Sequence, residues 1–193
     1  QDDWERVAPA LAAAVGESLV GVEPDPDRRG ELKARDAATV YFAPRGVGPT
    51  EWSRDERERT HIRRRFMLLG QTADGMRVFD VVRLLDAVDR VDRFSGTSRR
   101  LRGSGEAAAW ALHASLWANR VSEMSLDGLP PRNRDGISLL NVSRFVEMPQ
   151  LVLMAAERCG GVRLSVAAED ASQWAGLASA DFLAGGGVVI EPR

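Results

Sequence analysis

The chain has 193 residues, of which 44% are hydrophobic and 28% charged, a composition that suits one globular domain with a sizeable core. The net charge of −2 provides no basic field for nucleic acid or a membrane surface. A single cysteine excludes an internal disulfide, and with only two histidines we expect no zinc site, no other metal and no cofactor. No apolar run approaches the ~20 residues that cross a membrane.

The first part of the chain predicts helices and strands in alternation. Apolar residues at helical spacing predict a helix over residues 2–15. A strand over 18–22 and a short helix over 28–36 follow. Residues 38–43 are rich in β-branched and aromatic side chains, and they predict a strand buried on both faces of a parallel sheet.

The next part combines a charged stretch with the clearest helix. Residues 51–65 are highly charged and are expected to be irregular. The run Arg63–Arg65 within them is either a binding patch or a solvated, ion-paired stretch that leads into the core, and we favour the second. Apolar residues at helical spacing predict a helix over 74–91, with Asp74 as its N-cap.

From residue 99 onward, strands and helices alternate regularly. The predicted strands are 99–103, 121–126, 162–167 and 188–191, and the predicted helices are 107–117, 139–145, 149–158 and 171–184. This order implies right-handed βαβ crossovers. The predicted fold class is therefore α/β, a doubly wound and mostly parallel sheet with helices on both faces, whose ligands would bind at the carboxyl ends of the strands.

Residues 101–107 outline a strand, a tight turn and a helix. The nucleophile elbow of serine hydrolases has this form, with small residues two positions before and two positions after the nucleophile. In this chain the small residues are Gly103 and Ala107, so Gly105 and not Ser104 takes the nucleophile position. The sequence predicts the frame of a serine hydrolase without its reactive hydroxyl.

Several motifs in order resemble the α/β-hydrolase superfamily, and within it the acetyl xylan esterase-like proteins among the carbohydrate esterases. They are the Arg45–Gly48 turn after the strand at 38–43, the stretch 64–72 with Gly75–Arg77 and Asp80, the segments Leu140–Arg144 and Met148–Gln150, and the degenerate elbow. The resemblance covers about residues 17–193 and implies strands three to eight of that fold. Residues 1–193 are thus expected to form a single α/β-hydrolase-like domain. Because the chain starts at Gln1 and not at Met, we expect a fragment of a longer protein or a processed form, and the resemblance to strands three to eight makes the C-terminal part of a longer protein the expected fragment.

The resemblance implies a serine on the elbow, an acid after a later strand and a histidine after the last strand. Gly105 replaces the serine, and no histidine follows His113. Asp170 matches the position of the acid, but an N-cap for the following helix is its simpler interpretation. Asp127, after the preceding strand, has the same two interpretations. We therefore assign no catalytic, cofactor-binding or metal-binding residue.

An active Ser104 is the alternative interpretation of the elbow. Its flanking residues would then be Arg102 and Glu106, which are too large for the close approach of strand and helix. His113 would lie about 13 Å further along the helix axis, at 1.5 Å per residue. His61 would break the usual Ser–Asp–His order of this fold. The turn at 103–105 could also bind an anion or a nucleotide through its backbone amides, although its spacing matches no P-loop and matches a dinucleotide fingerprint only weakly, with Ala108 in place of the third glycine.

Four of the five tryptophans, those at 52, 110, 117 and 174, are candidates for a sugar platform. Trp110 and Trp117 are seven residues apart on one predicted helix, which indicates core packing for both. Trp52 lies in a polar loop near a strand end, and it is the one tryptophan we would test for contact with carbohydrate. Carbohydrate is thus a possible ligand, and the resemblance is compatible with a secreted or periplasmic protein.

Two functions remain from the sequence. The first is a structural or accessory α/β-hydrolase-like domain of an acetyl xylan esterase-like protein, which lacks its own catalytic triad. Its partner would be the remainder of its own polypeptide or another hydrolase domain. The second is an active serine carboxyl-ester hydrolase that acts on acylated carbohydrate and is completed by Ser104 or by residues outside this chain.

Overall fold

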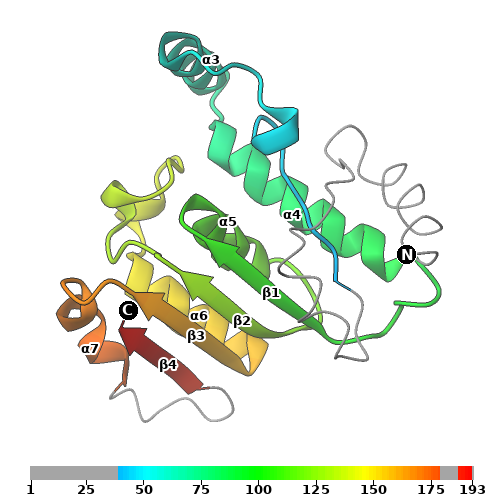
Figure 1. Ribbon diagram of the computed structural model, residues 1–193, viewed down its shortest axis with the longest axis vertical. Helices are drawn as coiled ribbons and strands as arrows, with labels where there is room; N and C mark the ends of the chain where they lie inside the picture. Colours follow the sequence, from blue (N-terminus) through cyan, green and yellow to red (C-terminus); the bar gives the residue numbers. More distant parts are fainter. Residues whose placement is uncertain (1–38, 179–186, 193) are drawn as a thin grey trace.

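A four-stranded, all-parallel sheet lies at the centre of the computed structural model, which describes residues 39–178 and 187–192 (Figure 1). The strands are β1 (Arg99–Ser104), β2 (Val121–Asp127), β3 (Gly161–Val166) and β4 (Gly187–Pro192). They pair in the order β1-β2-β3-β4, and each neighbouring pair is parallel. Each strand corresponds to a predicted strand within one residue or two at its ends.

Helices connect the strands. The helical segments are η2 (Gly48–Thr50), α3 (Glu56–Leu68), α4 (Ala73–Asp89), α5 (Glu106–Ser115), η3 (Asn133–Asp135), η4 (Val142–Arg144), α6 (Met148–Cys159) and α7 (Ala171–Ala178). The alternation of parallel strands with helices confirms the predicted α/β class. The predicted helices and strand before residue 38, and the end of the helix predicted to reach residue 184, lie outside the described residues.

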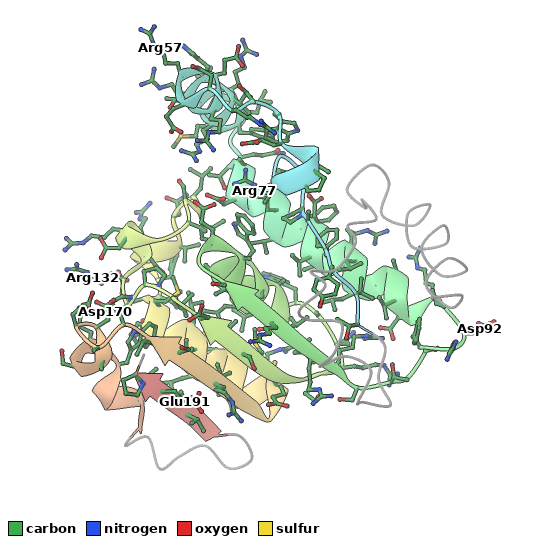
Figure 2. The ribbon with its side chains drawn as sticks, in the orientation of Figure 1. Arg57, Arg77, Asp92, Arg132, Asp170 and Glu191 are labelled. Atoms are coloured by element: carbon green, nitrogen blue, oxygen red, sulfur yellow. The ribbon has the colours of Figure 1, made fainter. Side chains whose placement is uncertain are left out.

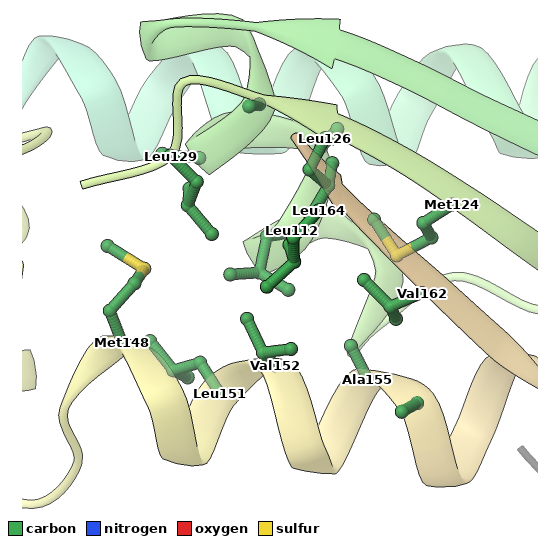
Figure 3. Close-up of a cluster of buried hydrophobic side chains, with 14 of the residues drawn as sticks. Leu112, Met124, Leu126, Leu129, Met148, Leu151, Val152, Ala155, Val162 and Leu164 are labelled. Atoms are coloured by element: carbon green, nitrogen blue, oxygen red, sulfur yellow. The ribbon is translucent and has the colours of Figure 1, made fainter. Parts of the chain in front are cut away.

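The main core lies between the sheet and helices α5 and α6. Alternate residues of β2 and β3 point toward these helices and are fully buried (Figure 3). They meet Leu112 from α5 and Val152 and Ala155 from α6. Because the strands are arranged in chain order, right-handed crossovers bring the helices after β1, β2 and β3 to the same face of the sheet.

The opposite face of the sheet is polar. The side chains that alternate with the core residues are exposed or half-buried, and they include Arg100, Arg102, Ser125, Arg163 and Ser165. Arg163 forms an ion pair with Glu191 on the neighbouring strand, at 3.1 Å. None of the described helices covers this face. The predicted class is thus observed with the described helices gathered on one side of the sheet.

The prediction of a strand over residues 38–43 is wrong for the residues that the structure describes. Residues 39–43 have no regular secondary structure, and most are only half-buried. A strand requires a neighbour to bond with, and β1, at the edge of the described sheet, pairs with β2 alone. High β-propensity was therefore not sufficient to form a strand here.

The prediction that residues 51–65 are irregular is also wrong, because most of them belong to α3. The Asp55 carboxylate accepts a hydrogen bond from Glu58 N at 2.9 Å and caps the helix. Glu56 pairs with Arg59 one turn later, at 2.7 Å. Ile62 and Phe66 form a narrow apolar stripe that faces the rest of the molecule. The charged side chains of this stretch therefore lie on a helix that is exposed to solvent.

Helix α4 begins one residue earlier than predicted and has a different cap. The Thr72 hydroxyl, and not Asp74, accepts the hydrogen bond from Gly75 N, at 2.9 Å. Asp74 instead joins three elements. Its carboxylate accepts hydrogen bonds from Arg77 on α4 (2.9 Å), from the Trp110 indole on α5 (3.1 Å) and from the backbone of Ser138 (2.9 Å). The Arg77 guanidinium also lies 5.0 Å from the centre of the Trp110 ring.

Two further predictions in the second half need correction. Trp110 is 3% exposed and lies in the core, but Trp117 is 76% exposed, because α5 ends at Ser115 and Trp117 no longer continues its buried face. The helix predicted at 139–145 is reduced to the single 3-10 turn η4. Helix α6 agrees with its prediction, with Pro149 in its first turn.

We expect Asp74→Ala to lower the free energy of unfolding by about 2–4 kcal/mol, because it leaves the buried Trp110 N–H without its acceptor and the buried Arg77 cation without its carboxylate partner. Asp86→Ala on the same helix removes only a surface pair with Arg83 and should change the value by less than about 0.5 kcal/mol. Urea unfolding of both variants measures the difference. Equal effects would contradict the central role of Asp74.

Candidate functional site

The turn from β1 to α5 is a single residue, Gly105. Its backbone angles are φ 58° and ψ −128°, a combination that side-chain-bearing residues adopt only under strain. The nucleophile of an elbow occupies such a sharp, strained strand-to-helix turn. The geometry therefore fits the predicted register, in which residue 105 and not residue 104 holds the nucleophile position.

The close approach of strand and helix at Gly103 supports the same register. A Cβ atom on Gly103 would lie 2.6 Å from the carbonyl oxygen of Ala107 and 2.8 Å from the Cα of Ala108. These contacts are with backbone, which cannot move away as a flexible side chain can. A Cβ atom on Gly105 would meet nothing within 4 Å, so the nucleophile position is open although it has no hydroxyl.

Ser104 lies at the end of β1, opposite Asp127 at the end of β2. Its hydroxyl donates a hydrogen bond to Asp127 Oδ2 at 2.9 Å, and the pair is exposed. The amide of Gly105 donates to the carbonyl of Asp127 at 2.8 Å, which fixes the turn against β2. The structure thus brings together two of the residues considered from the sequence, a serine and a carboxylate, at the carboxyl edge of the sheet.

Neither histidine completes this pair. Both lie among the described residues, and no hydrogen bond joins either of them to Ser104. His61 is on the exposed surface of α3. His113 is buried in α5, where burial lowers the pKa of its imidazole to about 4, so it is neutral near pH 7. The serine–histidine contact that activates a hydroxyl is therefore not formed within this chain.

Asp170 lies in the loop between β3 and α7, on the same side of the molecule as Arg132 of the loop after β2 (Figure 2). Its carbonyl accepts a hydrogen bond from Gln173 N at 2.9 Å, as expected of the residue before a helix. Its carboxylate accepts from the Gln173 side chain at 3.3 Å rather than from a backbone amide. The side chain of Asp170 thus contacts Gln173 of its own segment, and both the N-cap and the catalytic interpretations stay predictions.

The turn at Arg45–Gly48, which carries part of the resemblance, is held by α4. The Arg45 guanidinium binds Asp80 through two hydrogen bonds of 2.8 and 2.5 Å, and this contact raises the pKa of Arg45. The Arg77 side chain donates to the Arg45 carbonyl at 3.2 Å. The sequence pointed to Asp80 and Arg77 only through the resemblance. Their spacing of three along α4, which places both on one face, is the feature that could have linked them.

Trp52 lies against the same turn. Its ring stacks on Phe66 of α3 with 5.7 Å between ring centres, and it covers Gly46, where a Cβ atom would meet the indole at 2.8 Å. A cavity of about 20 Å³ beside Trp52, lined also by Arg59 and Arg77, has room for roughly one water molecule. One ring face is thus used within the protein, which weakens the case for Trp52 as a sugar platform.

The described residues offer no group of three or more His, Cys, Asp or Glu side chains placed to hold a metal ion. Within the same part of the chain, no helix is both long enough and apolar enough to cross a membrane.

Comparison with known proteins identifies no relative. No family model matches the chain, and neither does any curated protein or any solved structure. The α/β-hydrolase resemblance therefore rests on the motifs of this sequence alone.

We expect Gly103→Ala to lower the free energy of unfolding by about 1–3 kcal/mol or more, because the added methyl group would overlap the backbone of α5. Gly48→Ala provides the comparison: unlike Gly103, Gly48 has open surroundings and φ +57°, so only the left-handed backbone is strained, at about 1 kcal/mol. Denaturant unfolding compares the two. A smaller effect at residue 103 than at residue 48 would contradict the close approach.

His113 should make the stability depend on pH. Because its pKa is lowered on folding, the unfolded chain binds a proton at residue 113 between about pH 6.5 and 4, whereas the folded chain does not. Stability should therefore fall on acidification, by about 2 kcal/mol from pH 7 to pH 5 through this residue. Urea unfolding of His113→Gln beside the original protein isolates this contribution. An unchanged pH dependence would contradict the burial of a neutral imidazole.

Proposed function

We propose that this chain is an α/β-hydrolase-like domain of an acetyl xylan esterase-like protein, and that it acts as a structural or accessory domain without a catalytic triad of its own. The observation that carries the proposal is Gly105, which has the strained turn and the open surroundings of an elbow nucleophile but no side chain. The neighbouring Ser104 hydroxyl is bound to Asp127 and not to a base of the usual kind.

In this role the domain keeps the elbow for packing. The glycine at 103 lets β1 and α5 approach, and the glycine at 105 accepts the turn without strain. The partner would be the remainder of the same polypeptide or another hydrolase domain, and any carbohydrate would be bound there. The cheapest support would be a complete elbow and a late histidine elsewhere in the full reading frame.

The second candidate is an active serine carboxyl-ester hydrolase acting on acylated carbohydrate. The 2.9 Å contact between the Ser104 hydroxyl and the Asp127 carboxylate favours it, because a serine and a carboxylate already meet at the edge where parallel sheets bind ligands. It needs a histidine from outside this chain, since His61 and His113 are both placed elsewhere.

We expect the isolated chain to show no turnover of an activated acetyl ester such as p-nitrophenyl acetate above the buffer rate, and Ser104→Ala to be indistinguishable from it. Initial rates near pH 7.5 measure this, with circular dichroism to show that both proteins are folded. Turnover that disappears in Ser104→Ala, and persists in Ser98→Ala, would contradict the proposal and favour the second candidate.

A further inference from the structure

Helix α3 extends away from the sheet and its covering helices (Figure 1), and none of its residues is buried. Its inner side, formed by Ile62 and Phe66, is half-buried and lies toward Trp52. The rest of the helix surface faces outward, with Arg57 at its far end (Figure 2). A surface helix of this kind is expected to be polar all round its outer side.

The end of α3 departs from this expectation. Met67, Leu68 and Leu69 are 52%, 86% and 76% exposed, so three consecutive large apolar residues face solvent. Exposed apolar groups that lie together, rather than scattered singly, are characteristic of interaction sites. Leu68 and Leu69 contribute nothing to the described core, and the fold of this domain does not explain them.

Positive charge surrounds these residues. Helix α3 carries five arginines against two glutamates, in a chain whose net charge is −2. Arg59 and Arg63 pair with Glu56. Arg57, Arg64 and Arg65 are exposed, and among the described residues they have no ion-pair or hydrogen-bond partner. The helix therefore carries an excess of positive charge, and three of its guanidinium groups have no partner within the part of the chain that the structure describes.

We propose that the outer surface of α3, formed by Arg57, Arg64, Arg65, Met67, Leu68 and Leu69, docks a protein segment that is both acidic and apolar. Carboxylates of the partner would pair with the free arginines, which bind carboxylates in a bidentate manner. Apolar side chains of the partner would cover Met67, Leu68 and Leu69 and remove their exposed apolar surface from water, which favours binding.

A membrane surface is the other partner that basic and apolar residues attract, but the arrangement favours a protein. A helix that lies in a membrane interface needs an apolar stripe along its length, at helical spacing. The stripe of α3, Ile62 and Phe66, is turned toward Trp52 within the domain. The exposed residues 67–69 are consecutive and sit at one end, which suits insertion into a small depression of a folded partner.

This inference specifies the surface by which the accessory role would operate, but it does not need that role, because it rests on α3 and not on the elbow. Its test uses no esterase activity, so the two proposals fail separately. The probe is a fluorescein-labelled amphipathic peptide of leucine and glutamate, roughly 15 residues long so that it can form a helix. A second peptide replaces each glutamate by lysine, and a third replaces each leucine by serine.

We expect fluorescence anisotropy to show binding of the glutamate–leucine peptide and not of the other two. Arg64→Glu/Arg65→Glu and Leu68→Ser/Leu69→Ser should each weaken binding by roughly tenfold or more. Added salt should weaken binding to the original protein. Arg144→Glu/Phe145→Ser is the matched control, because it removes an exposed arginine and an exposed large apolar residue next to it on η4; its affinity should not change.

Hydrogen exchange of the original chain gives a readout that requires no substitution. The peptide should protect amides at the end of α3 and not those of η4. Absence of binding, equal affinity for the glutamate and lysine peptides, or unchanged affinity in the leucine variant would overturn the proposal. Binding to vesicles of anionic phospholipid that is lost in the leucine variant, without peptide binding, would assign the surface to a membrane instead.

Discussion

The close approach of β1 and α5 is the constraint on which the elbow depends. Because a Cβ atom at residue 103 would overlap the backbone of Ala107, strand and helix can join only through a glycine there. The joint is then short enough that one residue, Gly105, must reverse the chain with a positive φ. Two glycines thus fix the direction of α5, which brings Leu112 to the core and Trp110 to Asp74. The elbow serves the packing of the domain whether or not it performs chemistry.

Much of this arrangement was predictable, because it depends on local patterns. The apolar alternation of β2 and β3, the glycines of the elbow and the proline at the start of α6 each act within a few residues. Contacts between distant segments were not predictable in this way. Residues 39–43 have strand propensity but pair with no described strand, and the high charge of α3 concealed a helix in which Glu56 pairs with Arg59 and Arg63. Asp74 was expected to cap a helix, and its bond to Trp110 depends on how α4 meets α5.

The same distinction applies to the candidate site. The register that places Gly105 at the nucleophile position follows from the order of small residues, and its backbone angles fit that register. The contact between Ser104 and Asp127 follows from neighbouring parallel strands that end at one edge. For His113, spacing alone indicated a position about 13 Å along the helix axis from Ser104, although its burial in α5 did not follow from that spacing. The position of His61 could not be derived, because it lies on a helix that the sequence did not predict.

The central claim is that the elbow is intact in form and lacks a reactive nucleophile. The most direct measurement is the intact mass of the folded chain after exposure to a fluorophosphonate probe, which labels activated serines. The account predicts an unmodified mass for a protein whose circular dichroism shows native structure. A single adduct that maps to Ser104 would contradict it, because it would show that the hydroxyl beside Asp127, and not the empty position at Gly105, is the reactive centre of this domain.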